Sequence, residues 1–338
     1  MDVIKKSFKV CAISFRIMVW VIAYLFFGCS KPLPPEEGHK YLRAFDNEMI
    51  QLASRIGKTE AFGALIQLAE LPNPPIPFMS ENGINGYDFN GKKGYYHFNT
   101  ATGAFEKHWQ YNDEVELIYP FNSKHDSLVV FTLSDYSETK TALQMIFPQQ
   151  LEAKIKAGNK TLFTANLSAT FEHDFPAEME VEILFATFRI SILLHTSFRR
   201  SNAILNIKFD LEESGEKKFN TTLSAKVTNS NNTLKYSDVK FIMTAFPIRI
   251  NYHSSEDFSN SGAEHFIEAF NKNTKVYIAT PDDKKIGQVF LAQVYGRDRL
   301  NPMIRYHDGT VEHLEDMLFT LRKLLNMKMF IIDGNTGT

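Results

Sequence analysis

Residues 151–185 read LEAKIKAGNKTLFTANLSATFEHDFPAEMEVEILF, and apolar and polar side chains alternate along most of this stretch. Leu151 and Ile155 alternate with charged residues, and Gly158 with Asn159 then supplies a tight-turn signal before the next alternating run. Because successive side chains of a β-strand point to opposite faces, the pattern predicts antiparallel strands with one apolar face and one polar face.

The same alternation extends on both sides of this stretch. It occurs at residues 115–119, 129–133, 203–211, 219–227 and 239–243. Strands of roughly ten residues, at about 3.3 Å per residue, give a sheet about 30 Å tall. These consecutive runs, joined by short polar turns, predict a long antiparallel meander over residues 84–253.

Two kinds of irregularity mark the turns of this meander. The alternation changes phase after Phe185, and a slip of one residue reverses the faces of a strand, so we expect a turn or bulge at Ala186-Thr187. Asn90-Gly91 and Thr102-Gly103 are turn signals between shorter aromatic runs. Those runs predict hairpin strands over residues 86–89, 94–98 and 104–109.

Helical periodicity appears at both ends of the chain. Apolar residues three and four positions apart predict a helical hairpin over residues 39–71, which a run of prolines ends. Residues 261–332 combine helical and strand patterns. The elements expected there are a helix over residues 262–270, strands over 276–279, 289–295 and 303–306, and an amphipathic helix that begins at Thr310. The predicted fold is α+β and β-rich, a long antiparallel meander sheet that could curve into a half-barrel, with helices at both chain ends.

Residues 1–28 have the composition of a secretory signal peptide. A basic head precedes an apolar stretch over residues 17–27, which is shorter than the roughly 20 residues that a membrane span requires. Gly28 then precedes Cys29. A cysteine directly after a small residue resembles the bacterial lipobox, whose thiol is acylated before the signal is removed.

This resemblance implies cleavage between Gly28 and Cys29, an acyl chain such as palmitate on Cys29, and a flexible tether over residues 29–38. Phe26 and Phe27 depart from the lipobox, which has an aliphatic residue and a small residue at these positions. The alternative interpretation is an uncleaved signal anchor, with Cys29 a chance neighbour.

Composition narrows the classes of function. The formal net charge is −2, and it becomes −5 without residues 1–28, which carry four basic residues and one acidic residue. Such a body does not attract nucleic acid. Cys11 lies within the signal, so the mature body has no disulfide, no thiolate nucleophile and no cysteine-based metal site.

The apolar face of the predicted sheet needs a cover, because a bare patch of that size is not tolerated in a soluble protein. The sheet's own curvature, the terminal helices and a hydrophobic ligand are three alternative covers. The third makes the apolar face a candidate site for an acyl chain or a sterol-like molecule. Its candidate residues are Phe163, Leu167, Phe171, Val181, Ile183, Leu205, Ile207 and Phe209.

Motifs of known catalytic or metal-binding chemistry are absent from the sequence, so no catalytic residue, metal ligand or cofactor is expected. His307-Asp308, with the nearby residues Glu312, Glu315 and Asp316, is the densest polar cluster, and we interpret it as a turn followed by the solvated face of a helix. Asp282-Asp283 is interpreted as a loop.

Two further patterns concern saccharides. Asp126-Ser127-Leu128 resembles the O-glycosylation tripeptide of Bacteroidota, which makes Ser127 a candidate modification site. Trp109, with Tyr95, Tyr96 and Tyr111, could stack on a sugar, although aromatic residues of hairpins more often pair across strands.

The lipobox-like ending, the acidic proline-bearing tether and the alternating strands resemble uncharacterised lipoproteins of Bacteroidota. A more distant likeness, in topology alone, is to half-barrel lipoprotein carriers of the LolA and LolB type. These resemblances imply a non-enzymatic lipoprotein of the cell envelope, held at the outer membrane and facing the periplasm or the cell surface. Its expected partners are the membrane, a hydrophobic ligand and other envelope proteins. The alternative function is a surface adhesin, a fimbrial component or a glycan-binding component.

Overall fold

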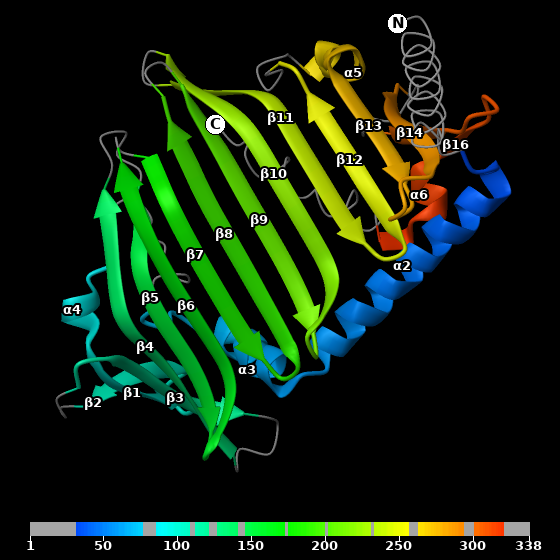
Figure 1. The fold of residues 1–338 in the computed structure, drawn as a ribbon. Coiled ribbons are helices and arrows are strands. Elements are labelled where there is room, and N and C mark those ends of the chain that lie inside the picture. The colour runs from blue at the N-terminus through cyan, green and yellow to red at the C-terminus, as the bar shows by residue number, and fades with distance from the viewer. Residues whose placement is uncertain are drawn as a thin grey trace, which may run out of the picture.

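The computed structural model describes residues 32–76, 86–108, 112–121, 127–140, 146–172, 175–199, 202–230, 233–256, 263–293 and 301–320. Within these ranges sixteen strands form one sheet, which is seen broadside in Figure 1. The spatial order is β16 through β3 in consecutive sequence order, followed by β1 and β2. The sheet is not closed, because β16 and β2 are its two edge strands.

The strands are β1 (Gly94–Asn99), β2 (Ala104–His108), β3 (Val115–Phe121), β4 (Ser127–Lys140), β5 (Ile146–Ala157), β6 (Lys160–Glu172), β7 (Phe175–Phe185), β8 (Phe188–Phe198), β9 (Ala203–Glu213), β10 (Glu216–Ser230), β11 (Thr233–Ala245), β12 (Ile248–Ser254), β13 (Thr274–Ala279), β14 (Lys285–Ala292), β15 (Asn301–Arg305) and β16 (Val311–His313). The helices are α2 (Pro35–Gly57), α3 (Glu60–Glu70), α4 (Phe89–Lys92), α5 (Ala263–Asn273) and α6 (Leu314–Met317).

The predicted fold class is confirmed. Every neighbouring pair of strands is antiparallel except β1 and β3, which run parallel. The predicted change of phase is a turn at Ala186-Thr187, where Ala186 adopts a φ of 48°. β13 to β16, which lie in the mixed C-terminal part, continue the same sheet.

Three local predictions were wrong. Residues 35–38 are helical rather than extended. Pro35 is well suited to the first turn of α2, and the negative charges of Glu36 and Glu37 interact favourably with the positive end of the helix dipole. Asn90-Gly91 lies in α4 instead of a hairpin, because the carboxylate of Asp88 accepts a hydrogen bond from the backbone N–H of Gly91 at 3.0 Å. The residues that precede it, 86–88, form no strand.

The third error concerns the closing helix. Residues 311–313 pair with β15 as a strand, and the short helix α6 follows, with residues 319–320 again helical at the end of the described range. Residues from 321 onward lie outside the described ranges. Glu315, expected on a solvated face, is 6% exposed.

One face of the sheet is buried at both ends by helices. At the β3–β6 end, α3 packs its Ala64 against a cluster in which Val115, Leu133 and Ile155 are fully buried. The hydroxyl of Tyr119 donates a hydrogen bond to the carbonyl oxygen of Ala64 at 3.0 Å. At the other end, α2 and α6 cover Ile248, Ile278 and Ile304, which are also fully buried.

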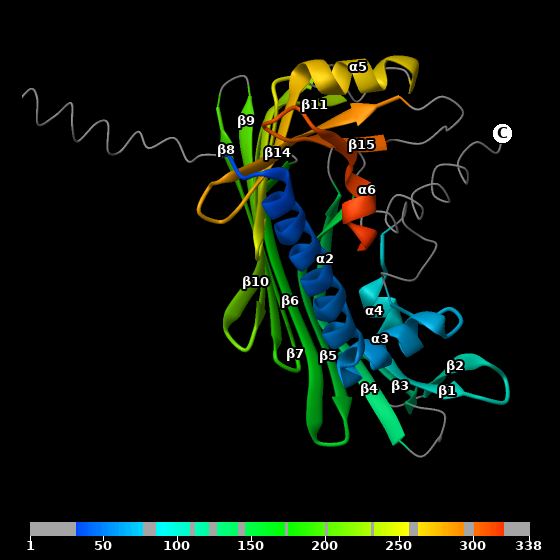
Figure 2. The same ribbon diagram turned by 90° about the vertical axis from the view of Figure 1, so that its right-hand side faces the viewer.

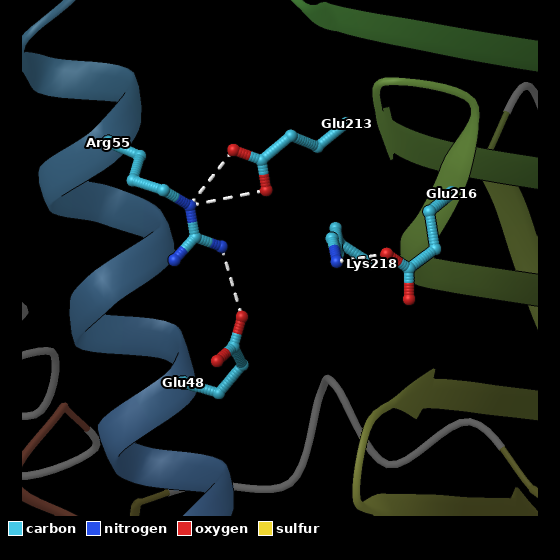
Figure 3. A network of polar contacts seen from close by, with 5 residues as sticks. All are labelled: Glu48, Arg55, Glu213, Glu216 and Lys218. Carbon is cyan, nitrogen blue, oxygen red and sulfur yellow. Dashed lines mark hydrogen bonds and ion pairs between the residues drawn. The ribbon is translucent and has the colours of Figure 1, made fainter.

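Helix α2 crosses this face obliquely and joins the two ends (Figures 1 and 2). Gly38 permits close contact with β14, since a Cβ there would lie 2.9 Å from Cγ2 of Ile286. Further along the helix, Leu52 packs against Phe188 and Leu211. Figure 3 shows the last turn of α2, where Arg55 reaches toward the β9–β10 turn.

Candidate functional site

The eight residues proposed for an apolar ligand lie on the face that α2 crosses. Strand register places Leu167 opposite Val181 and Phe163 opposite Phe185. On the next strands, Ile192 lies opposite both Val181 and Phe209. Phe171, at the bulged end of β6, has its ring 5.7 Å from that of Phe147. The alternation of the sequence therefore assigned the faces of these strands correctly.

Burial on this face is uneven. The core side chains at both ends include many that are fully buried, whereas seven of the eight candidates are only half-buried, and Leu205 alone is buried, at 8% exposure. Ile192, Leu194 and Leu223, which lie among them, are also half-buried. A belt across β6 to β11 is thus apolar and incompletely covered by the described part of the chain.

A large hollow lies on the other face of the sheet. It measures about 1020 Å³ and is lined by residues of eight strands, β4 to β11, five of which contribute three-residue runs such as residues 168–170, 193–195 and 206–208. In each run the outer two residues belong to the polar face, and the middle one contributes the intervening backbone. The predicted ligand site on the apolar face stays a prediction.

Two cross-strand rows of side chains form the floor of this hollow. We call them the first row and the second row. The first row is Ser137, Gln150, Ser168, Glu180, Leu193, Lys208, Thr222 and Ile242, each residue directly opposite the next. The second row is Thr170, Glu178, His195, Asn206, Ser224 and Lys240. Together they run perpendicular to the strands from β4 to β11.

Most polar side chains of these rows have no protein partner. In the described part of the chain, no hydrogen bond or ion pair holds the side chains of Gln150, Ser168, Thr170, Glu180, Asn206, Thr222 or Ser224. The four formal charges balance, with Glu178 and Glu180 against Lys208 and Lys240. The hollow therefore presents free donors and acceptors without a net charge.

The adjacent row of the same face is internally paired. Asp210, 7% exposed, accepts a hydrogen bond from Asn220 and forms ion pairs with Lys208 at 2.8 Å and Lys217 at 3.3 Å. Burial alone would raise the pKa of Asp210, but these three partners together lower it. Asp210, which lies outside the hollow, therefore holds the Lys208 ammonium by an ion pair, and it makes no such contact with the other floor residues.

A smaller aromatic hollow of about 480 Å³ adjoins the first one and shares Ser137 and Gln150 with it. Its rings are those of Tyr87, Phe89 and Tyr136, and the Tyr87 and Tyr136 rings meet edge to face at 5.2 Å.

Glu138 holds this aromatic cluster in place. Its carboxylate accepts hydrogen bonds from the backbone N–H of Tyr87 at 2.8 Å and from the hydroxyl of Tyr136 at 2.7 Å. Burial raises the pKa of Tyr136, and Glu138 raises it further, so that the phenol remains a proton donor. Burial likewise raises the pKa of Tyr87, whose hydroxyl donates to the carbonyl oxygen of Pro75 at 2.6 Å.

The sequence analysis missed this aromatic cluster. The pairing of β4 with β5 is interrupted between Ser134 and Ser137, and Asp135 adopts a φ of 49°. Such a bulge re-aims neighbouring side chains, and here Tyr136 falls in the aromatic hollow. The only available signal was the break in alternation at residues 134–137, which also resembles an ordinary loop.

Of the other predicted residues, Tyr95 and Tyr96 line neither hollow. Gly28, Cys29, Trp109 and Tyr111 are outside the described residues. Tyr96 is buried and donates a hydrogen bond to the carbonyl oxygen of Lys92, with the Lys107 ammonium over its ring. Ser127 begins β4, opposite Phe121, and its glycosylation stays a prediction.

The polar clusters noted in the sequence form turns. Asp308 accepts a hydrogen bond from the backbone N–H of Thr310 at 2.9 Å, and Asp282 accepts one from the hydroxyl of Thr280. In the described ranges no group of three or more His, Cys, Asp or Glu residues could hold a metal ion.

None of the helices that the structure describes is both long and apolar enough to cross a membrane. Comparisons with protein-family models, with curated proteins and with solved structures gave no match.

Proposed function

We propose that this chain is a non-enzymatic, lipid-anchored protein of the cell envelope that holds an acyl chain or a similar apolar ligand against the central apolar face of its sheet. The observation that carries the proposal is the contrast in burial on one continuous face. Helices at both ends bury core side chains of that face fully, and β6 to β11 between them keep half-buried side chains such as Ile192 and Phe209.

The size and chemistry of this belt support an elongated apolar ligand. Six strands spaced about 4.8 Å apart give a width of roughly 24 Å. The belt is mostly aliphatic and aromatic, with residues such as Val181, Leu194 and Leu223, although Thr196 and Thr221 also lie on it. Apolar surface gains about 25 cal/mol for each Å² removed from water.

The proposed anchor is consistent with where the described chain begins. The backbone N–H of Leu33 donates a hydrogen bond to the carbonyl oxygen of Lys285 at 2.9 Å, next to the start of α2. An acylated Cys29 would be four residues away from this contact, so the body would stay close to the bilayer that supplies its ligand.

Native mass spectrometry of the protein extracted from its own membrane tests the proposal. We expect a co-purifying lipid, and after delipidation we expect palmitate to raise the unfolding temperature. A ligand present at 100 times its dissociation constant stabilises by about 2.7 kcal/mol.

Two substitutions on neighbouring positions of β8 locate the effect. Ile192→Gln changes the apolar face and should abolish the stabilisation by palmitate, whereas Leu193→Gln changes the opposite face and should preserve it. A clean apo mass together with no stabilisation by palmitate would overturn the proposal.

A further inference from the structure

We infer that the polar face carries a second binding site, for an extended and uncharged oligosaccharide. The site is the two-row hollow, whose floor spans β4 to β11. It is independent of the proposed acyl site, because the two lie on opposite faces of the same strands.

The shape of the site favours a linear chain. The first row extends across eight strands, from Ser137 in β4 to Ile242 in β11, which spans about 34 Å at roughly 4.8 Å between strands. A compact ligand would use only part of such a surface, whereas a linear saccharide can place successive rings on successive strands.

The chemistry of the floor fits hydroxylated rings. The hydroxyl and amide groups of Ser168, Asn206 and Thr222, which have no partner among the described residues, can both donate and accept hydrogen bonds with sugar hydroxyls, and the Glu180 carboxylate can accept them. Leu193, 41% exposed, and Ile242 interrupt the polar floor with aliphatic surface, where the C–H face of a sugar ring can pack.

The charged side chains of the floor disfavour acidic saccharides. The floor has two carboxylates and two ammonium groups, and both lysines have acidic partners, Asp210 for Lys208 and Asp238 for Lys240. A polyanion would meet Glu178 and Glu180 with no uncommitted cation to offset them. An uncharged saccharide meets no such penalty.

Titration calorimetry of the full-length protein with cellohexaose, maltohexaose, mannohexaose and chitohexaose tests the inference, with a heparin hexasaccharide as the charged probe. We expect at least one uncharged hexasaccharide to bind, and the heparin fragment not to bind. The corresponding disaccharide should bind at least tenfold more weakly, because it spans few strands.

Three arginine substitutions at surface positions test the location. Ser168→Arg and Thr222→Arg place a long side chain on the floor from different strands, and each should weaken binding at least tenfold. Asn166→Arg is the matched control, because it lies on the same strand and face as Ser168 but outside the hollow, and it should leave affinity within about twofold.

Circular dichroism and the unfolding temperature show whether each variant is folded. Binding that survives Ser168→Arg and Thr222→Arg in folded protein, or binding of the heparin fragment alone, would overturn the inference. So would failure of all four uncharged hexasaccharides to bind.

Discussion

The buried carboxylate of Asp46 accepts hydrogen bonds from the backbone N–H of Thr320 at 2.9 Å and from its hydroxyl group, across 274 positions of sequence. The backbone N–H of Phe319 donates to the same carboxylate at 3.0 Å. A side chain in the middle of α2 therefore caps the backbone that follows α6, and the two ends of the described chain are held together on one side of the sheet.

Asp46→Ala should lower the free energy of unfolding by about 3 kcal/mol, because it removes a buried, charged acceptor of three hydrogen bonds. Urea unfolding at pH 7 measures the change. Asp308→Ala, which removes a carboxylate from an exposed turn, should have a much smaller effect. Equal losses in the two variants would contradict the structural role of Asp46.

Gly287→Ala should destabilise the protein by about 1–3 kcal/mol, since the sheet interior has no room for a methyl group there. A Cβ on Gly287 would lie 2.5 Å from Cγ1 of the fully buried Ile304 and 3.0 Å from the carbonyl oxygen of Arg305.

Gly57→Ala is the matched control for this substitution. It lies at the end of α2 with open space around it, and it should be neutral or about 0.5 kcal/mol more stable. Thermal unfolding distinguishes the two variants, and a stable Gly287→Ala protein would show that β15 can shift away from β14.

The sheet could be predicted from the sequence because alternation is a local property. The alternating pattern assigns Ile155, Phe163 and Phe185 to the apolar positions of three successive strands, and the structure places them side by side on one face. Tyr136 could not be assigned, because the bulge at Asp135 depends on how β5 pairs with β4, which is a non-local choice.

The hollow was also beyond prediction, for a different reason. A polar strand face with Ser168 and Thr222 looks the same in sequence whether it is flat or hollowed. Only the curvature of the assembled sheet decides between those outcomes. The burial of Glu315 was missed because the periodicity of residues 310–325 favoured one helix. In the structure residues 311–313 instead pair with β15 as a strand, and α6 begins after His313.

Leu52→Ala should cost about 2–4 kcal/mol, because Leu52 is 2% exposed and fixes α2 to Phe188 and Leu211. Arg55→Ala, one turn later, should cost clearly less. Its guanidinium pairs with Glu213 at 2.9 Å and Glu48 at 3.0 Å near the surface, where solvent screens the attraction (Figure 3).

The dependence on salt concentration distinguishes the ion pairs of Arg55 from the apolar packing of Leu52. Raising the ionic strength should shrink the Arg55→Ala difference and leave the Leu52→Ala difference unchanged in chemical unfolding. An Arg55→Ala loss as large as that of Leu52→Ala would mean that the ion pairs, and not apolar packing, attach this end of α2.

Asp210→Asn should destabilise the protein at pH 7 and lose that effect in acid. The pKa of Asp210 is lowered in the folded protein, so its ionised form contributes stability above its unfolded pKa of about 3.9. That contribution disappears as the pH falls through the lower folded value.

Unfolding free energies measured between pH 7 and pH 2 should therefore converge for the wild type and Asp210→Asn. Glu152→Gln is the control, because this carboxylate on the same face has no hydrogen bond or ion pair within the described residues. A constant gap at all pH values would indicate that Asp210 acts through shape rather than charge.

Cys29→Ser should abolish incorporation of radiolabelled palmitate and move the protein from the membrane fraction to the soluble fraction of a bacterial host. The thiol is the proposed acylation site, and stable attachment to a bilayer requires more than one acyl chain when no helix spans it. Cys11→Ser is the matched control, because it changes the chain's other cysteine without touching the proposed cleavage site, and it should keep both label and location. If Cys29→Ser kept label and membrane location, the uncleaved signal anchor would be the better explanation, and the acyl ligand would lose its proposed source in the anchoring bilayer. The two sites on the body would then be tested on their own, since each depends only on the face of the sheet that presents it.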